Sequence, residues 1–545
     1  MRRILCGIFF VSCVSLVCAA DSKVSSCEVP YKVLFNNDST NVQTCISPYH
    51  PENKQIDVNM FVASVHELDG HGVDAYMIQP GTGWVAWWKS KLYPIEEQHK
   101  WFKEHYGIEG DNQFDSILLS GKDFLGAMIE QCHKDKMAAF ISLRMNDAHH
   151  LEHTLDPQPW LVGVISRFYA EHYHMRLGES KKWCDNILDW GYPEVREHKL
   201  KLIKELCETY DIEGFELDFM RAASSYFNLD KTTSSERIAI INDFIHKVRQ
   251  ILDETTKDKK HRFLCVRIPA YTACYDSFGI DLPSMVENGV EMVNASAHYF
   301  TDQGTDFQQI VRSVPKTAVY LEMCHATCMG QAAKNSKYRY DNWTFRRTTP
   351  EQYYTTAHLA YTHGAKGVSL FNFVYYRQHG TGDGRGPFNE PPFEAIDRLA
   401  DKEWLKSQPQ HYFLGWQQPE IAPIEARDFI QLPKIINRKY PVRLVFNMAP
   451  PAKGWNGIGK LKIQTEEALK DKSKYKASLN GTPLKPCEDV SEPYPNPYSP
   501  LLGTNETLCA WYVPADVMRK GENTLSLRSE IDESAKILFV DIAVK

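Results

Sequence analysis

The chain has 545 residues, a formal net charge of −7 and 43% hydrophobic residues. This length is too great for one ordinary hydrophobic core and favours two domains. The acidic balance argues against nucleic acid as a partner, because a surface that binds a polyanion needs a broad basic patch.

Residues 1–20 have the features of a secretory signal peptide. Arg2 and Arg3 precede an apolar run over residues 4–17, and small residues follow before Asp21. The run is too short to span a membrane as a helix, and no later stretch is apolar enough to do so. We therefore expect a secreted or periplasmic protein without a membrane span, whose formal charge after loss of the two arginines is −9.

The signal peptide contains three of the 14 cysteines, so 11 remain after its removal. An odd number leaves at least one thiol free or bonded to another molecule. The favoured disulfides are Cys27 with Cys45 and Cys487 with Cys509, because the members of each pair are close in sequence near a domain edge.

Cys324 and Cys328 have His325 between them but lack a second pair of ligands, which makes a zinc site there a weak alternative. We expect neither a metal nor another cofactor.

Apolar runs alternate with segments of helical period over residues 21–405, as is typical of βα-repeat proteins. The expected strands are residues 32–36, 74–79, 138–144, 214–219, 263–268, 291–297, 318–323 and 367–373. The clearest helices are expected at residues 56–71, 122–134, 193–210, 235–258 and 350–363. Eight strands with helices between them predict a (β/α)₈, or TIM, barrel.

The fourth expected strand has an unusual pattern, in which Phe215, Glu216, Leu217, Asp218 and Phe219 alternate between apolar and acidic residues. Side chains on a strand alternate faces, so the two carboxylates share one face. Buried carboxylates are costly unless they are paired or used. Asp218 is expected at the C-terminal end of the barrel, where active sites lie, with Glu216 one layer deeper. The structural alternative is an ion pair of either acid with Arg221 or with another barrel arginine.

The stretch from Gly214 to Arg221, GFELDFMR, resembles the fourth-strand motif of the family 10-like glycoside hydrolases. Residues 34–38, 79–84 and 368–373, together with Trp87 and Trp88, are also similar to that family. The resemblance covers roughly the first four hundred residues. It implies a TIM barrel that acts on carbohydrate, but it supplies neither a substrate nor catalytic residues.

Long segments follow the second, third and eighth strands, at residues 80–120, 145–192 and 374–391. Long loops after barrel strands build binding clefts. The first of them contains Trp84, Trp87 and Trp88, which we expect to stack on sugar rings. The alternative is that these side chains only pack the loop against the barrel.

Cleavage of a glycosidic bond requires two carboxyl groups. The fourth and seventh strands end near Asp218 and Glu322, and these two strand ends carry the acids in a large group of retaining glycosidases with this barrel, a parallel drawn from the fold alone. We predict that Asp218 and Glu322 form the catalytic pair and that Glu216 tunes Asp218.

Other polar and aromatic residues at strand ends form the expected substrate-binding set. These are Asp38, Arg144, Asn146, Arg221, Arg267, His298, Tyr299, Asn372, Tyr375 and Arg377. Carboxylates and arginines bind sugar hydroxyls, although any single member could instead be a satisfied buried polar group; for His298 the two interpretations are equally good.

From about residue 411 the helical period gives way to short alternating runs separated by turn residues. This pattern predicts an antiparallel β-sandwich. Residues 520–527 resemble a late strand of galactose-binding-like jelly rolls. The expected organisation is a signal peptide at 1–20, a barrel at 21–405 and an accessory sandwich at 406–545.

The predicted function is hydrolysis of glycosidic bonds in a poly- or oligosaccharide. The alternative is a non-catalytic carbohydrate-binding protein built on a degenerate glycosidase barrel. The sequence specifies neither the sugar, the linkage nor the oligomeric state.

Overall fold

The computed structural model describes residues 28–45, 47–49, 55–178, 186–221, 225–256, 260–330, 344–377, 390–417, 431–495 and 504–545. The expected signal peptide and the Cys27 half of the first expected disulfide lie outside these residues. Within them, no helix is long and apolar enough to cross a membrane.

Eight parallel strands close into a barrel in the order β1-β10-β7-β6-β5-β4-β3-β2. They are β1 (Val33–Asn37), β2 (Ala75–Ile78), β3 (Ala138–Arg144), β4 (Gly214–Asp218), β5 (Phe263–Pro269), β6 (Met292–Ser296), β7 (Ala318–Cys324) and β10 (Gly367–Phe371). Each lies on a strand predicted from the sequence, so the predicted TIM barrel is confirmed.

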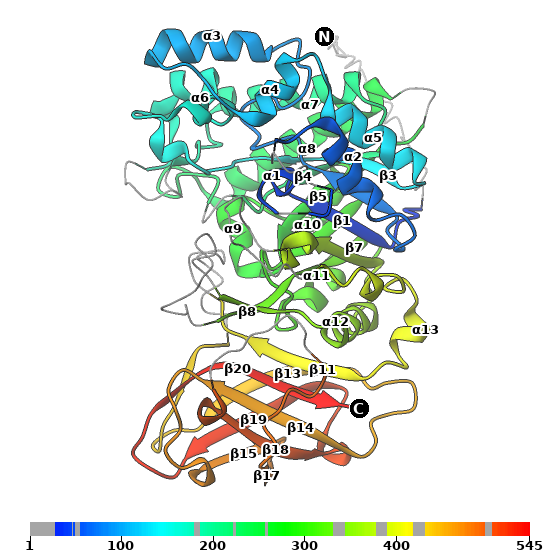
Figure 1. Ribbon diagram of the computed structural model, residues 1–545, viewed down its shortest axis with the longest axis vertical. Helices are drawn as coiled ribbons and strands as arrows, with labels where there is room; N and C mark the ends of the chain where they lie inside the picture. Colours follow the sequence, from blue (N-terminus) through cyan, green and yellow to red (C-terminus); the bar gives the residue numbers. More distant parts are fainter. Residues whose placement is uncertain are drawn as a thin grey trace, which may run out of the picture.

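Helices surround the barrel (Figure 1). The longer ones are α2 (Val58–His66), α3 (Ile95–Tyr106), α4 (Gln113–Leu119), α5 (Phe124–Lys134), α7 (Pro193–Thr209), α8 (Ser234–Thr255), α11 (Phe307–Ser313) and α12 (Pro350–Thr362). The shorter ones are α1 (Asn41–Thr44), α6 (Arg167–Glu171), α9 (Tyr275–Phe278), α10 (Leu282–Glu287) and α13 (Lys402–Leu405). The five predicted helices are present, and the 80–120 segment contains two more, α3 and α4. A hairpin of β8 (Ala326–Gly330) and β9 (Thr344–Arg347), which was not predicted, follows β7.

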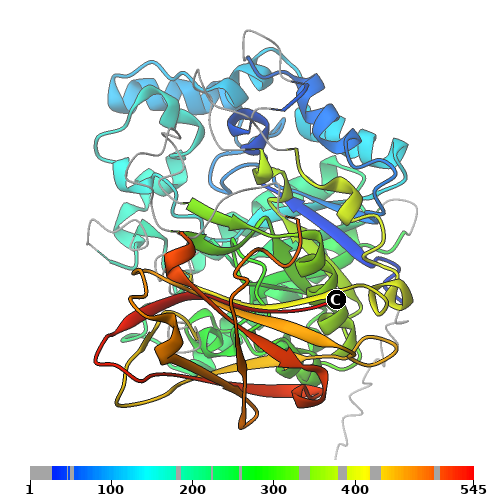
Figure 2. The same ribbon diagram turned by 60° about the horizontal axis from the view of Figure 1, so that its bottom comes forward.

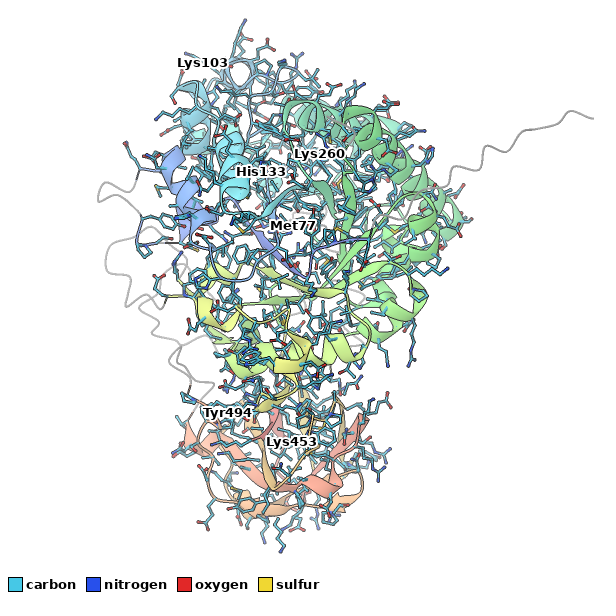
Figure 3. All side chains as sticks on the ribbon, turned by 90° about the vertical axis from the view of Figure 1, so that its right-hand side faces the viewer. Met77, Lys103, His133, Lys260, Lys453 and Tyr494 are labelled. Atoms are coloured by element: carbon cyan, nitrogen blue, oxygen red, sulfur yellow. The ribbon has the colours of Figure 1, made fainter. Side chains whose placement is uncertain are left out.

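The barrel interior changes from apolar to charged along its axis. The lower layer is apolar and includes Leu34, Met77, Phe140, Phe263, Met292 and Tyr320 (Met77 is labelled in Figure 3). Glu216 lies above this layer, where it accepts hydrogen bonds from Asn36 and Ser142. The charged layer that contains Asp218 lies at the C-terminal ends of the strands. This is the end at which TIM barrels carry their functional groups.

Strand β4 shows why its sequence alternates. Phe215, Leu217 and Phe219 are fully buried in the outer core between the strands and the helices, whereas Glu216 and Asp218 point into the barrel. At its start, a Cβ on Gly214 would lie 2.1 Å from the ring of Phe140, so only glycine fits there. The predicted two-faced strand is confirmed.

The C-terminal region is an antiparallel sandwich, as predicted (Figure 2). One sheet has the order β11-β20-β14-β18-β17 with β12 also on β20, and the other has the order β13-β19-β15-β16. The strands are β11 (Gln410–Gly415), β12 (Lys434–Ile436), β13 (Val442–Met448), β14 (Ile458–Thr465), β15 (Tyr475–Leu479), β16 (Thr482–Pro483), β17 (Lys485–Cys487), β18 (Leu508–Pro514), β19 (Gly521–Ser529) and β20 (Ala535–Val544).

The predicted disulfide between Cys487 and Cys509 is wrong. Both thiols are free. Cys487 lies opposite Ala510 in the pairing of β17 with β18, so its side chain is on the same face of the sheet as that of Ala510. The side chain of Cys509, one residue earlier, is therefore on the other face.

The sandwich packs directly against the barrel. Leu359 of α12 belongs to the hydrophobic core of the sandwich. Arg346 of β9 forms two hydrogen bonds with the carboxylate of Glu492, at 3.0 and 2.5 Å. Within the sandwich, Tyr494, labelled in Figure 3, donates to the carbonyls of Gln410 and Val544 at 3.2 and 3.0 Å.

Candidate active site

A cavity of about 290 Å³ lies at the C-terminal ends of the barrel strands. Its walls come from the loops that follow β1, β2, β3, β6 and β10. The lining side chains that matter below are Asp38, Arg144, His149, Trp160, Tyr299 and Tyr375. A larger groove of about 1020 Å³ lies at the opposite end, among residues at the starts of the strands. That end of a TIM barrel serves stability rather than chemistry, so the cavity is the candidate site.

Asp38 lies directly after β1, on the cavity floor. Its Oδ1 accepts from Arg144 Nη2 at 2.7 Å and from Arg221 Nη2, and its Oδ2 accepts from Asn372 Nδ2 at 2.9 Å. Burial alone would raise the pKa of Asp38, but Arg221 and Arg144 hold it well below its usual range. A carboxylate has about four acceptor positions, and these three side-chain donors occupy three of them.

The loop after β3 continues this network along the cavity. Arg144 Nη1 donates to Asp147 Oδ2 at 2.6 Å. Asp147 Oδ1 accepts the backbone N–H of His149 at 2.7 Å and contacts His149 Nδ1 at the same distance. Burial would raise the pKa of Asp147, yet His149 and Arg144 hold it well below its usual range. Asp147 is 1% exposed, whereas the His149 side chain is 38% exposed.

The predicted catalytic carboxylates, Asp218 and Glu322, both bind Arg267. Arg267 Nε and Nη2 donate to Glu322 at 2.7 Å each, and Nη1 donates to the two oxygens of Asp218 at 3.1 and 3.2 Å. Both acids are buried and neither lines the cavity. Asp218 therefore forms the ion pair with a barrel arginine that the sequence left open as the structural alternative.

Arg221 lies between Asp218 and the cavity floor. Its Nε is 3.9 Å from Asp218 Oδ2, its Nη2 donates to Asp38, and its Nη1 donates to the hydroxyl of Tyr299 at 3.1 Å. A ligand in the cavity therefore meets Asp38 before it meets Asp218.

Glu216 lies one layer below Asp218, as the alternation predicts. Burial raises the pKa of Glu216 to about 7, and the charge of Asp218 contributes to the shift. Glu216, one of the two acids on this face of β4, thus holds its proton to a higher pH than an ordinary glutamic acid does.

The three tryptophans expected to stack on sugars pack the loop instead. The indole N–H groups of Trp84, Trp87 and Trp88 donate to Asp147 O, Gly163 O and Glu205 Oε2 at 2.8, 2.7 and 3.0 Å. Each ring is at most 2% exposed. Trp84 and Trp88 do not line the cavity, and Trp87, which does, stacks on another ring of the loop core. The packing alternative therefore describes this group.

The remaining predicted binding residues divide into two groups. Tyr299 and Tyr375 line the cavity. Asn372 supports it from behind, because its Oδ1 accepts the backbone N–H of Asp38 at 3.0 Å.

Three others do not line the cavity, so the predicted contact with a ligand does not fit them. Asn146 bonds the backbone of Leu188, as donor at 2.9 Å and as acceptor at 3.2 Å, and so closes its own loop. Arg377 joins Glu67 and Glu390 at 2.7 and 2.6 Å, which ties α2 to the segment after β10. The ring of His298 packs on Tyr299, with centroids 4.3 Å apart.

Sequence reasoning missed Asp147, His149 and Trp160. The sequence contained a usable signal, because Asp147 and His149 follow the end of β3 at Arg144. A place at or after a strand end was the criterion by which the other candidates were chosen. Trp160 lies in the same loop and is 42% exposed, against 2% or less for the three tryptophans that were predicted.

Two groups of described side chains have three donor atoms within 4.8 Å of one another: His150 with Glu152 and His153, and His66 with Asp69 and Asp135. His153 lies 3.6 Å from Glu152 and His66 lies 3.1 Å from Asp135, as ordinary ion pairs do. Neither group is assigned as a metal site, and neither contains Cys324 or Cys328.

No protein-family model matches this chain, and no curated protein matches its sequence. Similar solved structures include the glycoside hydrolase domain of PgaB (BpsB) from Bordetella bronchiseptica, with 11% identity over 64% of this chain and 96% of that chain and a TM-score of 0.38. The alpha-L-fucosidase isoenzyme 2 from Paenibacillus thiaminolyticus has 12% identity over 70% of this chain and 51% of that chain, with a TM-score of 0.39. The maltogenic alpha-amylase AmyB from Thermotoga neapolitana has 10% identity over 94% of this chain and 99% of that chain, with a TM-score of 0.36. These neighbours are glycoside hydrolases, and the similarity does not single out family 10 or any other family.

Proposed function

We propose that this chain is a glycoside hydrolase that binds its sugar in the strand-end cavity. The observation that carries the proposal is the lining of the cavity, which places an ionised carboxylate, Asp38, and Arg144 beside the exposed indole of Trp160. Aromatic rings stack on the apolar faces of sugars, and charged groups bind the hydroxyls. The C-terminal end of a TIM barrel is also where hydrolytic groups are placed.

In this proposal Asp218 and Glu322 supply the carboxylates of the reaction. They lie at the ends of β4 and β7, and neither lines the cavity. A bound sugar reaches them only when Arg221 moves from its place between Asp38 and Asp218.

A second candidate is a protein that binds carbohydrate without cleaving it. The observation that favours it is that Arg267 forms buried ion pairs with both Asp218 and Glu322. Such a protein would use the same cavity and retain the buried ion pairs only for stability.

Activity on 4-nitrophenyl glycosides and on defined polysaccharides distinguishes the two. We expect the wild-type chain to release nitrophenol or reducing ends, and Asp218→Asn and Glu322→Gln each to lower turnover by about 10²–10⁴-fold. Glu67→Gln, which removes a buried partner of Arg377 outside the cavity, is the matched control and should keep its turnover.

Binding of a sugar by calorimetry with no bond cleavage would support the second candidate. Near-normal turnover of both Asp218→Asn and Glu322→Gln would show that the catalytic carboxylates lie elsewhere. All variants are assayed well below their unfolding temperatures, because loss of one partner of a buried ion pair also costs stability.

A further inference from the structure

Glycoside hydrolysis needs a group that protonates the leaving oxygen. Several titratable groups that line the cavity are poor proton donors near neutral pH. Arg221 and Arg144, against the effect of burial, hold the pKa of Asp38 well below its usual range, so Asp38 has no proton to give. Burial raises the pKa of Tyr375 well above its usual range, and burial lowers the pKa of His150.

His149 has the placement that this task requires. Its side chain is 38% exposed and lines the cavity, at the C-terminal end of β3. Its Nδ1 lies 2.7 Å from Asp147 Oδ1, and the same oxygen accepts the backbone N–H of His149. The two contacts fix the ring relative to its own main chain and place the Nδ1 proton toward the carboxylate. An imidazole that a buried carboxylate orients in this way is a recurrent proton-transfer device.

Asp147 is in turn fixed by the group that holds the cavity floor. Arg144 donates to Asp147 through Nη1 at 2.6 Å and to Asp38 through Nη2 at 2.7 Å. One guanidinium therefore sets the position of the histidine relative to the carboxylate that a sugar would contact. A pair that served only to close the loop would not need this link to the cavity.

We infer that His149 is the proton-transfer residue of this site and that Asp147 is its positioning residue. The inference rests on the proposed function and assigns the proton donor within it, which leaves the tasks at the anomeric carbon to Asp218 and Glu322. The bond between the anomeric carbon and the glycosidic oxygen breaks with its electron pair going to the oxygen, which takes the proton from Nε2 of His149. Water adds its hydroxyl to the anomeric carbon, and the proton that it loses restores the imidazolium through solvent.

Acidic and basic groups both face His149 in the cavity. Asp147 is in direct contact, and Asp38 lies on the floor of the same cavity. Arg144 opposes them but is paired with both acids, and the His150 ring lies 6.1 Å away. Tyr299 and Tyr375 also line the cavity. Asp147→Asn removes the carboxylate that orients the ring, so it should lower kcat/KM more for a glycoside whose leaving group needs a proton than for one whose leaving group does not.

The test compares two glycosides of one sugar, chosen by the screen above, that carry a 4-nitrophenyl or a methyl leaving group. His149→Gln retains a donor for Asp147 but cannot titrate. We expect it to lower kcat/KM for the methyl glycoside by about 10²–10⁴-fold and for the 4-nitrophenyl glycoside by less than about tenfold, because nitrophenolate leaves without a proton. The alkaline limb of the pH profile should be lost as well. His153→Gln, an exposed histidine of the same loop outside the cavity lining, is the control and should match the wild type.

Equal losses on the two glycosides, or an alkaline limb that survives in His149→Gln, would overturn the inference while the hydrolase proposal stands. A wild-type chain that cleaves neither glycoside would overturn both. His149→Asn, which shortens the side chain, is used in the same comparison in case His149→Gln does not fold.

Discussion

At the scale of single residues, the barrel interior is organised by three arginines that share four carboxylates. Arg267 holds Asp218 and Glu322, Arg221 holds Asp38, and Arg144 holds Asp38 and Asp147. Removing one partner of such a buried pair leaves an uncompensated charge, which is far more costly than replacing the whole pair.

The alternation of Glu216 and Asp218 predicted two inward-facing acids and their depths. It could not predict that Arg267 pairs with Asp218 and Glu322, because Arg267 lies 49 residues from Asp218 and 55 from Glu322 in the chain. Strand register, which sequence periodicity does not contain, brings them together.

Glu216 makes stability depend on pH. Its pKa is about 7 in the folded chain, against an ordinary value of 4.5, so between these values the folded chain binds a proton that the unfolded chain does not. The contribution of Glu216 to the free energy of unfolding is therefore largest below about pH 4.5 and falls as the pH rises toward 7. Glu216→Gln should reduce this fall, by at most about 3 kcal/mol.

Urea unfolding of the wild type and of Glu216→Gln at several pH values from 4.5 to 7.5 measures the effect. Burial also raises the pKa of Glu67 to about 7. Glu67 therefore titrates in the same pH range, and Glu216→Gln should keep part of the dependence of stability on pH. Identical slopes in the two proteins would contradict a protonated Glu216.

At the scale of elements, the strands were predictable because a parallel barrel strand needs a short apolar run with turn residues around it. The packing of the loops was harder to predict. A sequence does not distinguish exposed from buried tryptophans. Only the hydrogen bonds of Trp84, Trp87 and Trp88 to Asp147, Gly163 and Glu205 show that these side chains are packed in a small core. The hairpin of β8 and β9 was missed because it is short and directly follows β7.

Replacing Trp84 and replacing Trp160 by alanine should therefore have different effects on stability and on sugar binding. Trp84 is buried, and Lys199 Nζ lies 3.8 Å from the centre of its ring, so Trp84→Ala should cost about 3–5 kcal/mol of stability. Trp160 is 42% exposed in the cavity, so Trp160→Ala should change stability by less than about 0.5 kcal/mol but weaken sugar binding by about three- to tenfold.

Denaturant unfolding measures the first change, and calorimetric titration with the sugar found by the screen measures the second. Unchanged affinity in Trp160→Ala would remove the aromatic wall from the proposed binding site.

At the scale of the whole molecule, the sandwich begins with β11 at Gln410, close to residue 411, where the sequence loses its helical period. Its contact with the barrel was not predictable, because Arg346 and Glu492 are 146 residues apart in the chain. That the sandwich folds independently stays a prediction.

A double-mutant cycle of Arg346→Ala and Glu492→Ala measures how strongly the two parts are coupled. The pair is bidentate and Arg346 is 4% exposed, so we expect a coupling free energy above about 1 kcal/mol. The exposed pair of Arg438 and Asp532, at 3.5 Å, is the control and should give less than about 1 kcal/mol. Equal coupling free energies in the two cycles would mean that the ion pair between barrel and sandwich adds little to the stability of the protein.

The position of β20 has a consequence for the order in which the chain can fold. This strand pairs with β11, β12 and β14, so it lies inside its sheet, and β11 packs against α12 of the barrel. During synthesis the barrel segments emerge first, but the sheet that covers α12 stays incomplete until Ala535–Val544 has been made. Until then Leu359 has no completed sheet to cover it, and a chain that stops before Ala535 would expose it to chaperones or to aggregation.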